Sequence, residues 1–178
     1  MQLEFDYWYF KETLPKLLCR DIINFAKSKN DTQFAIVAGV KGVDKNSKKL
    51  NKRQKEKTLK TRNSKVVWLK EPWIISKILP FMKTANKNAG WNFFIEDCEA
   101  VQFTIYEKGQ YYGWHQDQNQ KAYDSPDPNF NGKIRKVSAI IQLTDPKKYK
   151  GGDIEFDFRN VDPELSKKKA CSFIACDK

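Results

Sequence analysis

Residues 102–117 read QFTIYEKGQYYGWHQD and include His115, the only histidine of the chain. The stretch predicts two β-strands joined by a turn at the glycine of EKGQ. Side chains two residues apart on a strand point to the same face of a sheet. We therefore expect His115 and Asp117 to present an imidazole nitrogen and a carboxylate oxygen to one ion, with Gln116 facing away.

Such a pair is two thirds of the set of two histidines and one carboxylate that holds non-haem Fe(II) and leaves other coordination positions open. By itself an H-x-D triplet is a weak motif, because it occurs by chance and a lone histidine on a strand is more often structural. The sequence around the triplet has to decide between these two interpretations.

Length and composition predict a single soluble domain. The chain has 178 residues, of which 40% are hydrophobic and 31% charged, and its mean hydropathy is −0.73. No stretch approaches the roughly 18 apolar residues of a membrane span, and the N-terminus lacks the pattern of a secretion signal. The four cysteines form no C-x-x-C pair, so we expect free thiols. These features predict a cytoplasmic protein without a membrane partner.

The formal net charge of +11 is concentrated in one segment. Residues 41–65, KGVDKNSKKLNKRQKEKTLKTRNSK, contain eleven Lys or Arg against two acids and therefore carry +9. This segment has little apolar content, so we expect a mobile loop or a loosely helical excursion. The rest of the chain has an ordinary charge balance.

The order of predicted elements is helices first and strands later. Apolar residues at three- and four-residue spacing predict a helix over 13–29, with Thr13 as N-cap, and a second helix is predicted over 71–90, kinked or split at Pro80. Strands are predicted over 34–40 and 64–69. From Trp91 onward the predicted strands are WNFFIEDCEAVQFTIYEKG, QYYGWHQDQ, IRKVSAIIQLTD and GGDIEFDF. This order predicts an α+β fold in which helices buttress an antiparallel sheet or barrel.

Residues 135–156, RKVSAIIQLTDPKKYKGGDIEF, follow the H-x-D stretch after a loop at 120–133 that has the Pro and Asn-Gly signals of a lid. Taken with Y-x₂-G-x₂-Y-x₂-H-x-D upstream, this sequence resembles the 2-oxoglutarate, Fe(II)-dependent oxygenases. The resemblance is to the prolyl-4-hydroxylase-like branch, which includes bacterial and phage hydroxylases. It is strongest from Gln102 to Phe156, and weaker signs extend back to Arg62.

The resemblance implies a distorted double-stranded β-helix, a jelly-roll or cupin-like barrel, within one oxygenase domain over 1–178. It implies His115 and Asp117 as the first two iron ligands and Tyr106 as a contact of 2-oxoglutarate. Two further candidates share a face of the VSAIIQLT strand. Gln142 stands where relatives often carry a tyrosine that contacts the far carboxylate of 2-oxoglutarate, and Ser138 lies on the same face.

The substrate side is expected to include Tyr112 and Trp114, with simple packing as the alternative for Tyr112. Arg135 is predicted to be a structural ion-pair partner rather than a catalytic group. The implied cofactors are Fe(II), 2-oxoglutarate and O2, with ascorbate as a further candidate.

The resemblance also implies a second metal histidine on a later strand, followed by an Arg or Lys that clamps 2-oxoglutarate, and neither is found here. We therefore expect that the C-terminal barrel strands are absent from this form. Such a form would bind iron weakly and turn over little 2-oxoglutarate.

Three functions stay open at the level of sequence. The first is a dioxygenase that hydroxylates a C–H bond of a peptide or protein, with proline first by family resemblance. The second is an oxygenase acting on nucleic acid, with the basic segment gripping phosphates. The third is a catalytically degenerate binding module whose H-x-D triplet is vestigial.

Overall fold

The computed structural model describes residues 5–35, 51–96, 98–117 and 121–157. The chain divides into two compact units, each built from stretches that are separate in the sequence. Unit 1 comprises Met1–Ile23, Leu79–Ile95 and Val137–Lys178, and unit 2 comprises Asn24–Ile78 and Glu96–Lys136. Each unit is described by itself.

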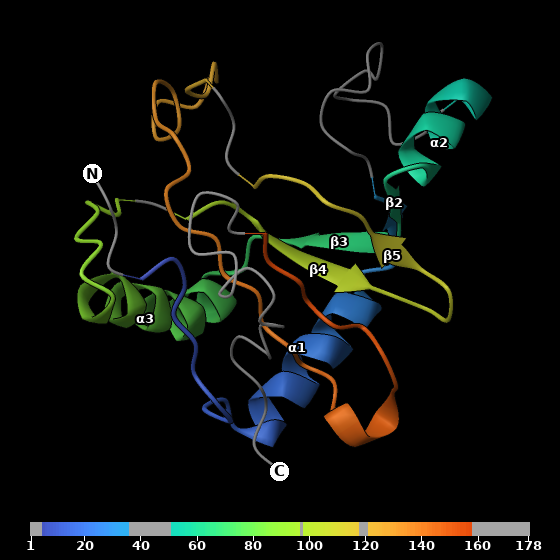
Figure 1. The fold of residues 1–178 in the computed structure, drawn as a ribbon, viewed down its shortest axis with the longest axis horizontal. Helices are drawn as coiled ribbons and strands as arrows, with labels where there is room; N and C mark the ends of the chain where they lie inside the picture. Colours follow the sequence, from blue (N-terminus) through green and yellow to red (C-terminus); the bar gives the residue numbers. More distant parts are fainter. Residues whose placement is uncertain (1–4, 36–50, 97, 118–120, 158–178) are drawn as a thin grey trace. The chain divides into compact units, whose positions relative to one another are not determined.

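Unit 2 contains a three-stranded antiparallel sheet with the strand order β1-β3-β4 (Figure 1). The strands are β1 (Gln33–Phe34), β3 (Lys65–Leu69) and β4 (Val101–Ile105). The central strand β3 is rich in β-branched residues, which suit a pleated, half-buried surface. Val66, Val67 and Leu69 are all buried, so β3 is the apolar centre of this sheet. The strand predicted at 64–69 is confirmed.

A second, shorter antiparallel sheet in unit 2 pairs β2 (Arg62–Asn63) with β5 (Tyr111–Tyr112). The connection between β4 and β5 turns at Gly109, whose φ of +77° is in the left-handed region that glycine adopts readily. The turn is closed by the main-chain hydrogen bond from Gln110 N to Glu107 O (3.0 Å). The predicted turn between two strands is therefore confirmed, although β5 is short.

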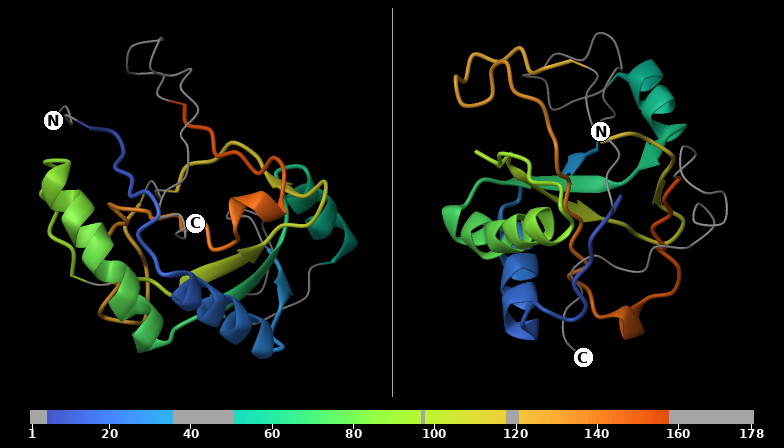
Figure 2. Two further views of the ribbon diagram at one scale, coloured as in Figure 1. Left: turned by 90° about the horizontal axis from the view of Figure 1, so that it is seen from below. Right: turned by 60° about the vertical axis from the view of Figure 1, so that its left-hand side comes forward.

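Three α-helices and one 3-10 turn complete the described elements, which Figure 2 shows from two further directions. They are α1 (Lys16–Ser28), α2 (Lys52–Leu59), α3 (Pro72–Asn88) and the 3-10 helix η1 (Pro146–Lys148). The predicted N-terminal helix is confirmed, but it begins at Lys16, so Thr13 is too far upstream to be its N-cap. Helix α3 continues through Pro80, so the predicted split does not occur.

The basic segment is more ordered than expected where it is described. Residues 52–59 form α2, beside β2 (Figure 1). Asn51 Oδ1 accepts a hydrogen bond from Gln54 N, and Gln54 Oε1 accepts one from Asn51 N, both at 2.9 Å. This capping box satisfies two main-chain donors that a helix otherwise leaves free. Residues 36–50, including most of the strand predicted at 34–40, lie outside the described part.

The run of strands predicted after Trp91 is largely wrong. Apart from β4 and β5, residues 91–96, 98–100 and 113–117 form no strand, and the segments at 134–145 and 151–157 contain only isolated bridges at Gln142 and Ile154. Alternating sequence supplies a face for a strand but not the hydrogen-bonded neighbour that it requires. The described residues thus form a mixed α/β structure with small antiparallel sheets. They do not form a closed barrel or a double-stranded β-helix.

The core of unit 1 surrounds Leu14 and Cys19, which are both buried. Partly buried apolar side chains pack against them, namely Phe10, Leu18, Phe81, Ile141 and Leu143. Cys19 is buried in this core, and Cys98 forms no disulfide, as predicted for it. No helix within the described ranges is long and apolar enough to cross a membrane.

Candidate metal site

The structure brings His115 and Asp117 together in unit 2. His115 Nε2 lies 3.2 Å from Asp117 Oδ1, and both side chains are partly exposed. The strand on which their common face was predicted ends at Tyr112, so an irregular turn rather than a strand makes this contact. A nitrogen donor and a carboxylate oxygen are therefore available to one ion at the surface of the unit.

The orientation of the His115 ring favours a cation at this position. Its Nδ1 lies 2.8 Å from the carbonyl oxygen of Gly113, while Nε2 faces the Asp117 carboxylate. A neutral imidazole carries one N–H, so it can donate to only one of these two oxygen acceptors. If Nδ1 donates to the carbonyl, Nε2 turns its lone pair toward the carboxylate. A metal ion or a second proton between Nε2 and the carboxylate removes the repulsion between the nitrogen lone pair and the negative charge.

Tyr112 and Arg62 form a stack with the His115 ring. The Tyr112 and His115 rings are 3.6 Å apart between centroids and nearly parallel at 8°. The Arg62 guanidinium carbon also lies over the Tyr112 ring, 4.3 Å from its centroid. The β2–β5 pairing explains this contact, because Arg62 and Tyr112 are direct cross-strand partners.

Arg62 is buried at 4% exposure, although arginine is rarely buried unless it is paired. Its Nε donates to Ser64 Oγ at 2.8 Å, and its Nη2 is buried without a hydrogen-bond partner among the described residues. Burial raises the pKa of Tyr112, and the Arg62 charge opposes that rise. In the sequence, Arg62 was only a weak sign of the family resemblance. The one other feature that could have drawn attention to Arg62 is its position just before an apolar strand.

Arg135 connects Asp117 to a neighbouring carboxylate. Its Nε and Nη2 donate to the two oxygens of Glu99 at 2.9 and 2.6 Å, and its Nη1 donates to the main-chain carbonyl oxygen of Asp117 at 2.7 Å. Burial raises the pKa of Glu99, but hydrogen bonds from Arg135 and Tyr123 outweigh burial and hold that pKa below its usual range. The hydrogen bond to Glu99 in turn raises the pKa of Arg135. The predicted ion-pair role of Arg135 is confirmed.

The loop predicted as a lid is closed on itself by main-chain hydrogen bonds. Tyr123 N donates to Lys133 O at 2.8 Å, and Gly132 N donates to Tyr123 O at 2.9 Å. The Tyr123 hydroxyl donates to Glu99 Oε1 at 2.7 Å, and Lys133 forms an ion pair with Glu96 at 2.5 Å. Both ends of the 123–133 loop are thus held to the segment around Glu99.

The other predicted site residues are placed as follows. Tyr106 directly follows β4 and is about half exposed, and Trp114, next to His115, is 64% exposed. Both belong to unit 2. Ser138, which is exposed, and Gln142, which is half-buried, belong to unit 1.

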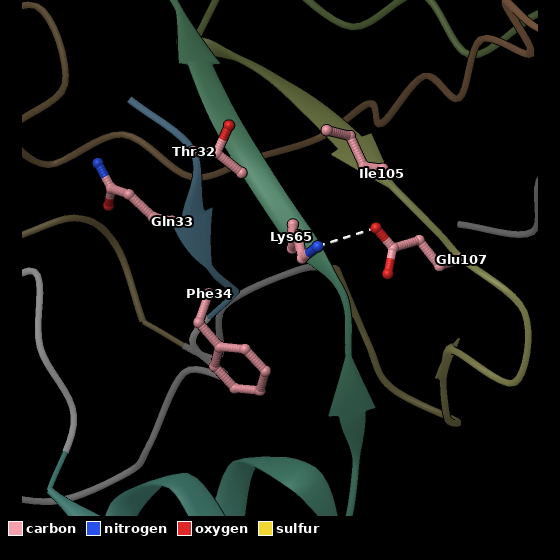
Figure 3. A pocket seen from close by; sticks show the side chains of 6 residues that line it. All are labelled: Thr32, Gln33, Phe34, Lys65, Ile105 and Glu107. Carbon is pink, nitrogen blue, oxygen red and sulfur yellow. Dashed lines mark hydrogen bonds and ion pairs between the residues drawn. The ribbon is translucent and has the colours of Figure 1, made fainter. Parts of the chain in front are cut away.

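One hollow in unit 2 is lined by none of these residues. Its volume is about 490 Å³, and its lining comprises Thr32, Gln33, Phe34, Lys65, Ile105 and Glu107. Figure 3 shows that the ion pair between Lys65 Nζ and Glu107 Oε1, 2.8 Å long, lies at this hollow. Lys55 Nζ lies 5.6 Å from the centroid of the Phe34 ring. The hollow is therefore separate from the His115 and Asp117 pair.

The donor set fits two of the three protein ligands of a non-haem iron centre. The chain has one histidine, and no three His, Cys, Asp or Glu side chains gather as a metal site within the described ranges. An imidazole and a carboxylate with open positions beside them are typical of the class that holds Fe(II) for oxygenase chemistry.

Comparison with known proteins points to the same class. Residues 101–175 match the family model of the 2OG-Fe(II) oxygenase superfamily. No curated protein and no solved structure matches the chain. The matched segment contains the His115 and Asp117 pair, and the match supports a general oxygenase function. The cofactors that this family implies are Fe(II) and 2-oxoglutarate.

Proposed function

We propose that this protein is a dioxygenase dependent on 2-oxoglutarate and Fe(II) that hydroxylates a C–H bond, most simply in a prolyl or other residue of a peptide or protein. One observation carries the proposal. Within the segment that matches the oxygenase family, His115 Nε2 and Asp117 Oδ1 face each other at 3.2 Å, with Nδ1 of the same ring on a carbonyl oxygen. The prolyl-4-hydroxylase-like branch and the barrel fold remain parts of this proposal.

In this proposal His115 and Asp117 hold the iron. When bound, iron and 2-oxoglutarate supply the chemistry that activates O2 for insertion into a C–H bond. The Tyr106 hydroxyl donates to a carboxylate of 2-oxoglutarate, a charge-assisted hydrogen bond. Gln142 and Ser138 are further candidates for binding 2-oxoglutarate, and ascorbate is a candidate reductant.

Tyr112 and Trp114 are proposed for the substrate side. Tyr112 holds the His115 ring by stacking on it, so it also sets the direction of Nε2. Trp114 exposes a large flat surface next to His115, where a substrate ring or methylene could pack. Neither residue is proposed to transfer a proton.

Anaerobic Mn(II) and Fe(II) titration in the presence of 2-oxoglutarate tests the metal site. We expect Asp117→Asn to weaken metal binding at least about 10-fold, because it removes an anionic ligand. Asp124→Asn is the matched control, since Asp124 is an exposed carboxylate of the same unit. Equal metal affinity of Asp117→Asn and the unaltered protein would refute the assignment. Metal binding without 2-oxoglutarate turnover would favour a degenerate binding module.

A second candidate function, action on nucleic acid, is favoured by helix α2. Its exposed face carries Lys52, Arg53, Lys55 and Lys57. Cations grouped on one helix suit a phosphate backbone, and such binding weakens steeply with salt. Turnover and salt-dependent binding should be compared between proline-rich peptides and oligonucleotides. Salt-sensitive oligonucleotide turnover without peptide turnover would replace the peptide proposal.

A further inference from the structure

Asp117 is held through its main chain as well as through its carboxylate. Its side chain meets His115, whereas its carbonyl oxygen accepts the hydrogen bond from Arg135 Nη1. The main-chain bond fixes where the residue sits, and the side chain then reaches the imidazole from that position. A shift of this carbonyl would carry the carboxylate with it.

The direction of Arg135 Nη1 is in turn set by Glu99. The guanidinium is planar and rigid, and two of its donors engage both oxygens of one carboxylate. With that fork in place, the third donor has no freedom to rotate independently. The Glu99–Arg135 pair therefore acts on Asp117 as a fixed bracket rather than as a loose surface charge pair.

The 123–133 loop contacts the same Glu99–Arg135 pair through Tyr123. Tyr123 donates its hydroxyl to Glu99 Oε1, the oxygen that also accepts from Arg135 Nε. The main-chain hydrogen bonds between Tyr123 and the 132–133 end close this loop. Movement of the loop thus pulls on the carboxylate that orients the guanidinium.

We propose that Arg135 is a positioning residue for the metal ligand Asp117, and that Glu99 and Tyr123 couple the 123–133 loop to that ligand. This inference rests on the proposed metal site. Ligand carboxylates need support for their orientation, and loss of such a supporting contact typically weakens metal binding about 10- to 100-fold. Arg135 contacts the ligand and is not proposed to touch metal or substrate.

The test uses Arg135→Lys, which keeps the charge but loses the planar fork. Lys65→Gln is the matched control, because it breaks a comparable ion pair of unit 2, the one between Lys65 and Glu107. Tyr123→Phe removes the hydrogen bond that the loop donates to Glu99. Each full-length variant is compared in Mn(II) affinity, in metal-free unfolding, and in the NMR signals of its imidazole ring. Because the chain has one histidine, those ring signals report on His115 alone.

We expect Arg135→Lys to weaken Mn(II) binding about 10-fold and to move the His115 ring signals of the metal-free protein at fixed pH. Tyr123→Phe should have a smaller effect of the same kind, and Lys65→Gln should leave both readouts unchanged. If Arg135→Lys resembles Lys65→Gln in both readouts, the positioning role is wrong. If the unaltered protein binds no metal, the proposed function fails, and the ring signals alone then decide the positioning role.

Discussion

At the scale of single residues, His115 is held by three different kinds of contact. A carbonyl oxygen faces Nδ1, a carboxylate faces Nε2, and the Tyr112 ring covers one face of the imidazole. The two polar contacts restrict rotation of the ring, and the stack on Tyr112 restricts its tilt. An imidazole held in this way would lose little conformational freedom on binding a metal, as the proposed function requires.

Glu99 leads to a prediction on pH. Its pKa in the folded protein lies below the ordinary value of 4.5 because the hydrogen bonds from Arg135 and Tyr123 outweigh burial. The stabilisation that Glu99 contributes is therefore present above pH 4.5 and is lost as the pH falls through its lower, folded-state pKa. Glu99→Gln should lower the free energy of unfolding by about 1 kcal/mol at pH 7, since the pair is partly exposed.

Urea unfolding of Glu99→Gln and the unaltered protein between pH 3 and pH 7 measures this difference. It should shrink below pH 4.5 as Glu99 becomes protonated in the unaltered protein. Glu107→Gln serves as the comparison, because its partner Lys65 is more exposed than Arg135. A difference that stays constant across this pH range would contradict the assignment.

At the scale of elements, the β2–β5 pairing places the contact between Arg62 and Tyr112 next to His115. Gly113 follows β5 and donates from its main-chain N to Thr61 O at 2.7 Å. A Cβ atom at Gly113 would lie 3.3 Å from that same oxygen, a tight contact with main-chain atoms that have little room to give. The close approach of the two strands at this point therefore depends on the absence of a side chain.

Gly113→Ala should separate β2 from β5 slightly and destabilise the protein by about 1 kcal/mol, the lower end of the cost of overpacking. Because Nδ1 of His115 faces the Gly113 carbonyl, the imidazole signals should shift as well. Chemical denaturation and NMR of the His115 ring measure both effects. Gln116→Ala, at an exposed position of the same segment, is the control, and equal behaviour of the two variants would refute the argument.

The elements differ in how far the sequence predicted them. Helices α1 and α3 and strand β3 were predicted in type and approximate position, because their signals are local. The apolar face of α3, with Ile74, Ile78 and Ala85, recurs at helical spacing and is buried as expected. Helix α2 has no apolar face, but its Asn51 and Gln54 form a local capping signal that favours a helix. Most strands after Trp91 were overpredicted, because pairing partners are not local.

At the scale of the whole molecule, the sequence provides one histidine, whereas a non-haem Fe(II) site of two histidines and one carboxylate needs two. A metal held by His115 and Asp117 has a free coordination position that a small nitrogen ligand can occupy. We expect free imidazole in the millimolar range to raise Co(II) affinity and any 2-oxoglutarate turnover of this chain severalfold. His115→Ala with imidazole is the control, since it must replace two nitrogen ligands.

Metal titration with and without imidazole, together with succinate formation from 2-oxoglutarate, measures this rescue. Strong turnover without imidazole would show that another group already completes the site. No rescue and no metal binding would count against an iron centre at His115 and Asp117.

The sequence by itself determined the residue types of the candidate site, its family resemblance and the local elements. His115 and Asp117 are two residues apart, so their identity and proximity are local properties of the chain. Arg135 was predicted to be a structural ion-pair partner, but its partner Glu99 could not be read from the sequence.

Only the tertiary structure decided which residues support that pair. Arg62 reaches Tyr112 across a strand pairing, and Arg135 reaches both Glu99 and Asp117 from distant positions in the chain. Contacts over 18, 36 and about 50 residues depend on how the chain closes loops, which spacing in a sequence does not encode. For this reason the proximity of His115 and Asp117 could be predicted, whereas the side chains that contact them from distant positions could not.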